Sequence, residues 1–320
     1  MLFGVAIGLT AGIFVPATSV ADSSYPSHPI RLVIPFPPGG PTDVFGRLFA
    51  QNLADVLGQP VVPHNRAGAG SAIGVTHVAT SDPDGYTVLF GTGSIATGAA
   101  MTKLPYDPRK DIVPVAHAGI VPLVLLTAPD MPKSVPGLLA HLKANPGKMS
   151  YGSAGPGTTT HLAGEMLKLK AKVDPVHVPY KGSAPALADA MAGRVAFVFE
   201  TITASKPMYS SGKLNLIAVG TKERSPLLPD VPTVAEGGVP GMAAYTWNIV
   251  FVPAGTPRAI IDRLNQASNR VLGDPAFAKR MAELATQVVS DSTPESARDF
   301  YFSELDLWAS IVRESGVKPN

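Results

Sequence analysis

Four stretches of the chain repeat one order of residues: an apolar run, a glycine-rich turn, and then apolar positions at helical spacing. In the first stretch, the apolar run at 30–36 meets the breakers at 37–41, and a helical period follows until Gly58. A short apolar run that gives way to a 3.6-residue period predicts a strand, a turn and a helix. The other three stretches begin at Tyr86, near Met149 and at Val176.

Strands that alternate with helices indicate the α/β class with a mostly parallel sheet, because a parallel pair needs a crossover of helical length. The later sequence predicts short strands at 195–199 and 214–219, and a helix at 258–272 that Pro257 opens. A final helix carries apolar residues that we assign to the core: Leu305, Trp308, Ile311 and Val312.

The composition narrows the class of protein. The 320 residues include 26 Lys+Arg and 24 Asp+Glu, which gives a formal net charge of +2, and no dense basic run is present. We therefore expect no nucleic-acid partner. The length allows two lobes or one large domain. The absence of cysteine excludes disulfides, thiol nucleophiles and cysteine metal sites.

The first 21 residues have the pattern of a secretory signal. They carry no charge, are mostly apolar and end on small residues at Ser19 and Ala21, just before Asp22. This pattern predicts export with cleavage near Ala21, although the basic residues that usually open such a signal are absent. The segment is interrupted by glycine and proline and is too short to be a spanning helix.

The glycine-rich turns are candidate anion sites. Backbone N–H groups at a helix start lack intrahelical partners and lie at the positive end of the helix dipole. In open α/β sheets such turns lie at the carboxyl ends of the strands, where ligands bind. Glycine also serves tight turns alone, and each turn taken singly favours that explanation. Four similar turns together favour a binding cleft.

Other uses of these residues fit less well. No glycine loop carries the Lys-Ser/Thr of a P-loop, and neither the Gly-x-Ser-x-Gly nor the His-Glu-x-x-His motif is present. The glycines at 68–74 resemble a dinucleotide fingerprint, but residues 63–67 separate them from the expected strand at 60–62. We keep a nicotinamide-dependent oxidoreductase as an alternative. His161 and Glu165 share a helical face without a third ligand nearby, so we expect no metal and no cofactor.

The combination of motifs along the chain resembles the Bug family of tripartite tricarboxylate transporter receptors. These motifs are Pro-Phe-Pro-Pro-Gly-Gly-Pro-Thr-Asp at 35–43, Asn-Arg-Ala-Gly-Ala-Gly at 65–70, Pro-Asp-Gly-Tyr-Thr at 83–87, Tyr-Gly-Ser-Ala-Gly-Pro-Gly-Thr at 151–158, Pro-Tyr-Lys-Gly at 179–182, Pro-Asp-Val-Pro-Thr at 229–233 and Pro-Ala-Gly-Thr-Pro at 253–257. The resemblance covers essentially the whole chain after residue 21.

The resemblance implies a type II, Venus-flytrap periplasmic binding protein with a ligand cleft between two lobes. Lobe 1 is expected at 22–122 plus 248–320, and lobe 2 at 123–247; periodicity does not reveal this division. The implied function is that of a non-enzymatic, monomeric periplasmic receptor. It would capture a small organic carboxylate and deliver it to membrane transporter subunits, and a sensor without transport is the second alternative.

The resemblance also nominates ligand-binding residues. In the first lobe these are Phe36, Pro38, Gly39 and Gly40, with Asp43 bracing the loop and Ser94 as a further candidate. In the second lobe they are Ser153, Gly155, Gly157, Thr158 and His161. Lys181 could add a charge or merely keep the surface soluble. Trp247 could close over the ligand or pack at the hinge.

Glu200 stands where the family usually has aspartate. A carboxylate inside a carboxylate site repels its guest unless it faces an amine, a hydroxyl or a shared proton. Glu200 could therefore select an amino or hydroxy acid. Alternatively, it could cap the following turn through Thr201 or Thr203.

Overall fold

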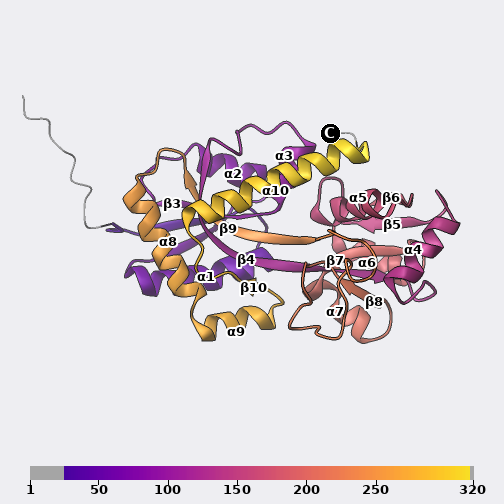
Figure 1. Cartoon of the computed structure of the whole chain (residues 1–320). Helices are drawn as coiled ribbons and strands as arrows, with labels where there is room; N and C mark the ends of the chain where they lie inside the picture. The colour runs from indigo at the N-terminus through magenta and orange to yellow at the C-terminus, as the bar shows by residue number, and fades with distance from the viewer. Residues whose placement is uncertain (1–24, 318–320) are drawn as a thin grey trace, which may run out of the picture.

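The computed structural model describes residues 25–317, so the signal predicted at 1–21 lies outside the described part of the chain. The elements form two groups joined by long strands (Figure 1). We call the group from β1 to α3 the first lobe and the group from α4 to β8 the second lobe. No helix within residues 25–317 is both long and apolar enough to cross a membrane.

The first lobe is built from strand, turn and helix units, as the pattern predicts. Its elements are β1 (Ile30–Ile34), α1 (Pro41–Leu57), β2 (Val61–Asn65), the 3-10 turn η1 (Ala69–Ser71), α2 (Ala72–Ala79), β3 (Thr87–Thr92) and α3 (Ser94–Met101). β1 lies parallel to both β2 and β3. Gly58 ends α1 in the left-handed region, with φ of 70°, where glycine has no steric cost.

The second lobe repeats the same construction. Its elements are α4 (Val135–Ala144), β5 (Ser150–Ser153), α5 (Thr159–Ala171), β6 (Val176–Pro179), α6 (Ser183–Met191), β7 (Phe197–Thr201), α7 (Ile202–Ser210) and β8 (Asn215–Val219). β5 lies parallel to β6 and β7. β7 begins two residues later than the predicted strand at 195–199, because a turn continues past α6 and the N–H of Arg194 bonds to the carbonyl of Asp189.

Two long strands connect the lobes. β4 (Ile112–Thr127) pairs with β9 (Tyr245–Pro253) in the first lobe, and its far end pairs with β7 and β8 in the second. All of these pairings are antiparallel, as is β3 with β9. The expectation of a mostly parallel sheet therefore holds for β1–β3 and for β5–β7, and it fails for every strand that pairs with β4 or β9. The predicted lobe boundaries near residues 122 and 247 fall within β4 and β9.

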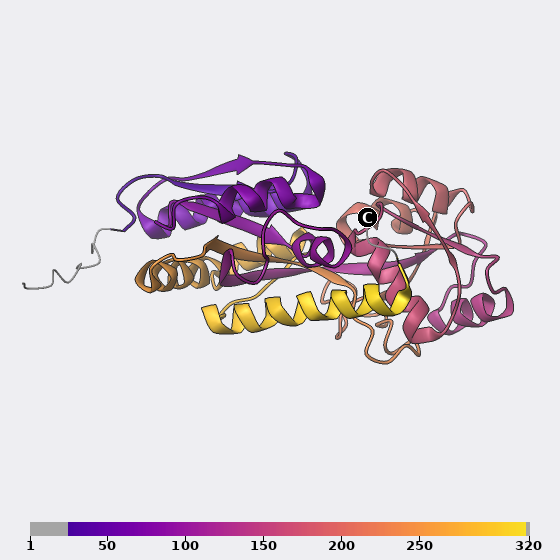
Figure 2. The same ribbon diagram turned by 90° about the horizontal axis from the view of Figure 1, so that it is seen from above.

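The C-terminal helices cover the junction. α8 (Arg258–Leu272) has the predicted bounds, and α9 (Pro275–Glu283) and the short strand β10 (Gln287–Val288) follow it. α10 (Pro294–Ser315) contacts α3 of the first lobe, β4 and α5 of the second lobe. Figure 2 shows this helix running along the molecule until its last turns reach the second lobe. One apolar cluster, which includes Leu89, Leu125 and Trp308, continues through both lobes.

Candidate ligand-binding site

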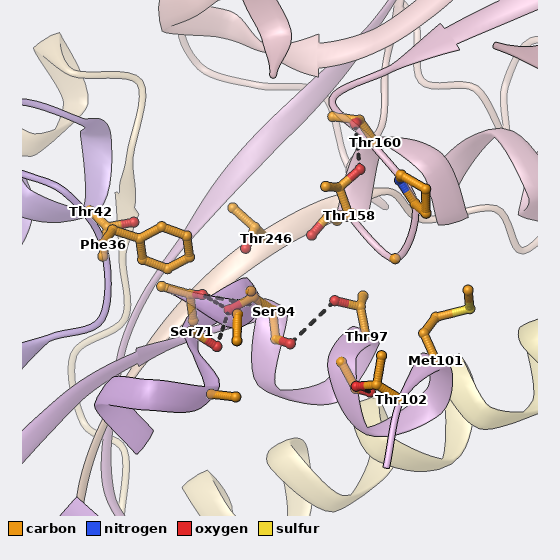
Figure 3. A pocket seen from close by; sticks show the side chains of 18 of the residues that line it. Phe36, Thr42, Ser71, Ser94, Thr97, Met101, Thr102, Thr158, Thr160 and Thr246 are labelled. Atoms are coloured by element: carbon orange, nitrogen blue, oxygen red, sulfur yellow. Dashed lines mark hydrogen bonds between the residues drawn. The ribbon is translucent and has the colours of Figure 1, made fainter. Parts of the chain in front are cut away.

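A cavity of about 430 Å³ lies where the two lobes face each other. The first lobe contributes Phe36 and Thr42 after β1, residues 69–72 and α3, and the second contributes residues 156–160 with Ser183 and Thr201. Figure 3 shows Phe36 and Thr42 on one side, Thr158 and Thr160 on the other, and Ser94 and Thr246 between them. One chain thus supplies both walls of the cavity.

The lining is polar without being charged. More than half of the lining residues carry a hydroxyl, and none of the residues that line the cavity, all within 25–317, is acidic or basic. An anion in this cavity would be held by neutral donors. Such donors, fixed in place by the fold, stabilise an anion well when they exclude bulk water.

Six helices begin at the cavity wall. The lining includes a residue at or within two positions of the start of α1, α2, α3, α5, α6 and α7. α1, α3 and α6 are preceded by Gly40, Gly93 and Gly182. At the start of α3, the N–H of Ser94 donates to Oγ1 of Thr92 at 3.3 Å, whereas no side chain caps α1 or α6. Because helix N-termini favour negative charge, this convergence suits a carboxylate.

A chain of hydroxyls joins two of these helix starts. The Oγ of Ser94 lies 2.7 Å from Oγ1 of Thr92 and donates to Oγ of Ser71 at 2.9 Å. Ser71 precedes α2 with φ of 90°, a region that L-residues rarely adopt. Backbone strain of this kind collects at functional sites. No residue at 68–74 is nominated as carboxylate-binding from the sequence, yet Ser71 and its neighbours line the cavity.

The turn after β1 is held by Asp43 from within α1. Of the predicted first-lobe residues, Phe36 lines the main cavity. Pro38 and Gly40 line an adjoining hollow of about 300 Å³ that Phe36 shares. Gly39 has φ of 87° and donates its N–H to Oδ2 of Asp43 at 2.9 Å.

Asp43 itself is buried and turned away from the cavity lining. Its oxygens also accept hydrogen bonds from Arg47 Nε at 2.9 Å and from Asn65 Nδ2 at 2.7 Å. Burial acts to raise the pKa of Asp43, but these hydrogen bonds outweigh burial and hold the pKa below its ordinary value. Asp43 braces the loop as an ionised carboxylate.

The loop between β5 and α5 faces the first lobe across the cavity. Gly157 and Thr158 line the cavity, whereas Ser153 and Gly155 lie behind them. Thr158 caps α5 by accepting from the His161 N–H at 3.3 Å, and it donates to the Gly155 carbonyl at 2.7 Å. A Cβ on Gly157 would lie 3.5 Å from Met101 of α3, so the lobes approach closely here.

Two stacked histidines support this loop from behind. The rings of His161 and His177 lie 3.9 Å apart between centroids. Nδ1 of His161 accepts the Gly157 N–H at 3.2 Å, and Nε2 of His177 lies 2.7 Å from Oγ of Ser153. Burial lowers the pKa of both histidines to about 4, so both are neutral at pH 7. His161 therefore serves the site as an acceptor that positions the loop.

Two other predicted residues lie outside the lining. Lys181 is exposed at the start of the turn before α6. Glu200 is buried behind Thr201, whose N–H donates to Oε1 of Glu200 at 2.8 Å. Burial raises the pKa of Glu200, against the opposing hydrogen bonds of Ser183 and Thr201. The carboxyl is thus one residue removed from the cavity wall.

Trp247 packs beneath the cavity rather than over it. Its side chain is fully buried, and its Nε1 donates to Oε2 of Glu304 at 3.0 Å. The same carboxylate accepts from Trp308 Nε1 at 3.2 Å and from the Tyr245 hydroxyl at 2.9 Å. Within residues 25–317, no three acidic or histidine side chains gather as they would around a metal ion.

Comparison with known proteins places this arrangement in context. Residues 45–317 match the family described as "Tripartite tricarboxylate transporter family receptor". Protein BugT of Bordetella pertussis is 41% identical over 314 residues, which cover 97% of this chain and 95% of BugT.

Two solved structures with bound acids resemble the chain along most of its length. An R. palustris protein with adipate is 34% identical, with a TM-score of 0.81, over 92% of this chain and 100% of that one. MatC from Rhodopseudomonas palustris with bound malate is 32% identical, with a TM-score of 0.76, over 90% of this chain and 100% of MatC.

Proposed function

Because this chain belongs to the tripartite tricarboxylate transporter receptor family, we propose that it captures a small organic carboxylate between its lobes and delivers it to membrane transporter subunits. Its fold is that of a two-lobed periplasmic solute-binding protein, and the resemblance seen in the sequence is confirmed. The family and its solved neighbours are binding proteins rather than enzymes, so the oxidoreductase alternative is wrong.

The observation that carries the proposal is the convergence of six helix N-termini on an uncharged cavity between the lobes. A carboxylate accepts several hydrogen bonds at once and gains from each helix dipole. The neighbours with adipate and malate share this chemical group. Family members are periplasmic, and we place this chain there too. Since one chain supplies both walls, a monomer suffices.

A ligand screen tests the proposal directly. The purified protein is heated with members of a carboxylate panel, and a ligand that binds only the folded state raises Tm according to the ratio of its concentration to Kd. Small-angle scattering then measures the radius of gyration, which should fall as the lobes close. A broad panel that changes neither Tm nor radius would refute capture of a carboxylate.

Ser94→Asp separates binding from folding. An acidic residue in the first turn of α3 suits the helix dipole, so the fold should keep its stability. The same charge would repel a bound carboxylate and weaken binding at least about tenfold, or about 1.4 kcal/mol. Ser296→Asp, in the first turn of α10 away from the cavity, is the control and should bind as the parent protein does.

A further inference from the structure

The cavity has an apolar side that a small polar acid would leave unfilled. Besides the hydroxyl-bearing residues, the lining includes larger apolar or aromatic side chains: Met101, Leu104, Tyr106 and Leu123. In Figure 3, Met101 lies on the side of the cavity away from Phe36. Tyr106 makes no side-chain hydrogen bond among the described residues and contributes its ring to this wall.

This side continues into a second hollow of about 530 Å³, which we call the apolar branch. It shares Ala69, Ala72, Thr102 and Leu104 with the main cavity, so the two spaces adjoin at Leu104. Its other walls are Ile73 and Thr76 of α2 and residues 103–105. Ile73 keeps 52% of its surface exposed, so this wall of the branch faces solvent.

Charge is absent along the branch until its outer rim. The described residues of its wall are apolar or carry a threonine hydroxyl, apart from the exposed Lys103. The helix starts that suit a carboxylate lie in the main cavity. Donors thus gather at one end and apolar surface at the other, which matches an amphipathic ligand with one anionic head.

We propose that this receptor selects monocarboxylates with an apolar tail, whose head meets the helix starts and whose tail passes Leu104 into the apolar branch. This rests on the proposed function for the carboxylate head. Burial of a methylene stabilises a complex by about 0.8 kcal/mol, or roughly fourfold in Kd. A second carboxylate in the branch faces apolar and threonine side chains and finds no charged partner among them except the exposed Lys103.

Calorimetric titration of two matched acid series tests this selectivity. The monoacids are butanoate, hexanoate and octanoate, and the diacids are succinate, adipate and suberate. We expect Kd to fall roughly fourfold for each added methylene in the monoacids, and each diacid to bind at least about tenfold more weakly than the monoacid of equal length. The inference would be overturned by a Kd that does not change along the monoacid series, or by diacids that bind as tightly as the monoacids of equal length.

Leu104→Trp supplies the structural test, because the indole fills the junction of the two spaces. The variant should lose the fall of Kd with chain length that the parent protein shows. Leu227→Trp, at a leucine 43% exposed and remote from the cavity, should leave the dependence intact. If Kd depends on chain length in Leu104→Trp as it does in the parent protein, the tail does not lie in the apolar branch, and the inference is overturned while the proposed function stands. If the parent protein binds none of the acids, the proposed function itself is refuted.

Discussion

Asp43 shows how one side chain can shape a ligand loop without touching the ligand. The loop at 37–40 consists of proline and glycine, which offer no side-chain hydrogen bonds of their own. Asp43 supplies the missing acceptor by binding the Gly39 N–H, while Arg47 and Asn65 hold the carboxylate in place. The geometry of the loop therefore depends on a charge located in the next helix.

We expect Asp43→Asn to lower the free energy of unfolding by about 1–3 kcal/mol at pH 7, because the hydrogen bonds from Gly39, Arg47 and Asn65 lose their charged acceptor. The lowered pKa means that this stabilisation is present above the ordinary aspartate pKa and disappears as pH falls through the lowered value. The difference between variant and parent should thus shrink in acid. Urea unfolding across this pH range measures it.

Asp55→Asn is the matched control for this prediction. Asp55 lies on the same helix but is exposed, and it forms no ion pair among the described residues. Its substitution should change stability little at any pH. Equal losses in the two variants would contradict the bracing role of Asp43.

Sequence reasoning found the bracing role of Asp43 but missed Ser71. The motif at 35–43 places an acid just after a glycine turn, which is a local signal. Ser71 depends instead on a strained backbone and on contact with Ser94, 23 residues away. No helix is predicted at 72–79 from the sequence, so the sequence carries no signal that Ser71 stands at a helix start. For Trp247 the sequence left two roles open, contact with the ligand or packing at the hinge. An indole side chain suits either role, so the residue type alone could not decide between them.

At the scale of elements, a helix start serves stability and binding together. Thr158 caps α5 and also lines the cavity. Ser134 caps α4 in the same lobe, where it accepts the Gly137 N–H at 3.2 Å, and it lies outside the cavity lining. The two residues form a natural pair for separating the two roles.

Thr158→Ala and Ser134→Ala should each lower the free energy of unfolding by about 1 kcal/mol, because each removes an N-cap. Only Thr158→Ala should weaken ligand binding, by about tenfold, because the Thr158 hydroxyl also donates to the Gly155 carbonyl and so holds the loop that lines the cavity. Thermal unfolding and calorimetric titration measure the two effects. Equal affinities in the two variants would exclude a role for Thr158 in ligand binding.

The predicted helices and strands agree with the structure where the apolar residues follow a regular period. β6 begins at the predicted Val176 and α8 has the predicted bounds, because each is a regular segment with clear flanking residues. β4 and β9 have no such signal. Both are buried on both faces, so their residues do not alternate, and β4 contains Pro114 and Pro122. Proline usually demotes a strand prediction.

At the scale of the whole molecule, several elements connect the two lobes, so the lobes are not two independent bodies joined by a single hinge. β4 and β9 run through the junction, and α10 contacts helices of both lobes. The two-lobed arrangement came from resemblance to a family, because residues 122 and 247 lie inside strands rather than at a change of composition. The pairing of distant strands is a tertiary property that local pattern does not contain.

The shared carboxylate at this junction has an optical consequence. Trp247 and Trp308 are the only tryptophans of the chain, and both donate to Glu304. Trp247 sits on a crossover strand with its indole nitrogen beneath Gly93, at the start of α3. Indole emission responds to nearby charge and polarity. The protein therefore carries a native fluorescent reporter on β9, and the proposed closure of the lobes could be followed by its emission without a dye.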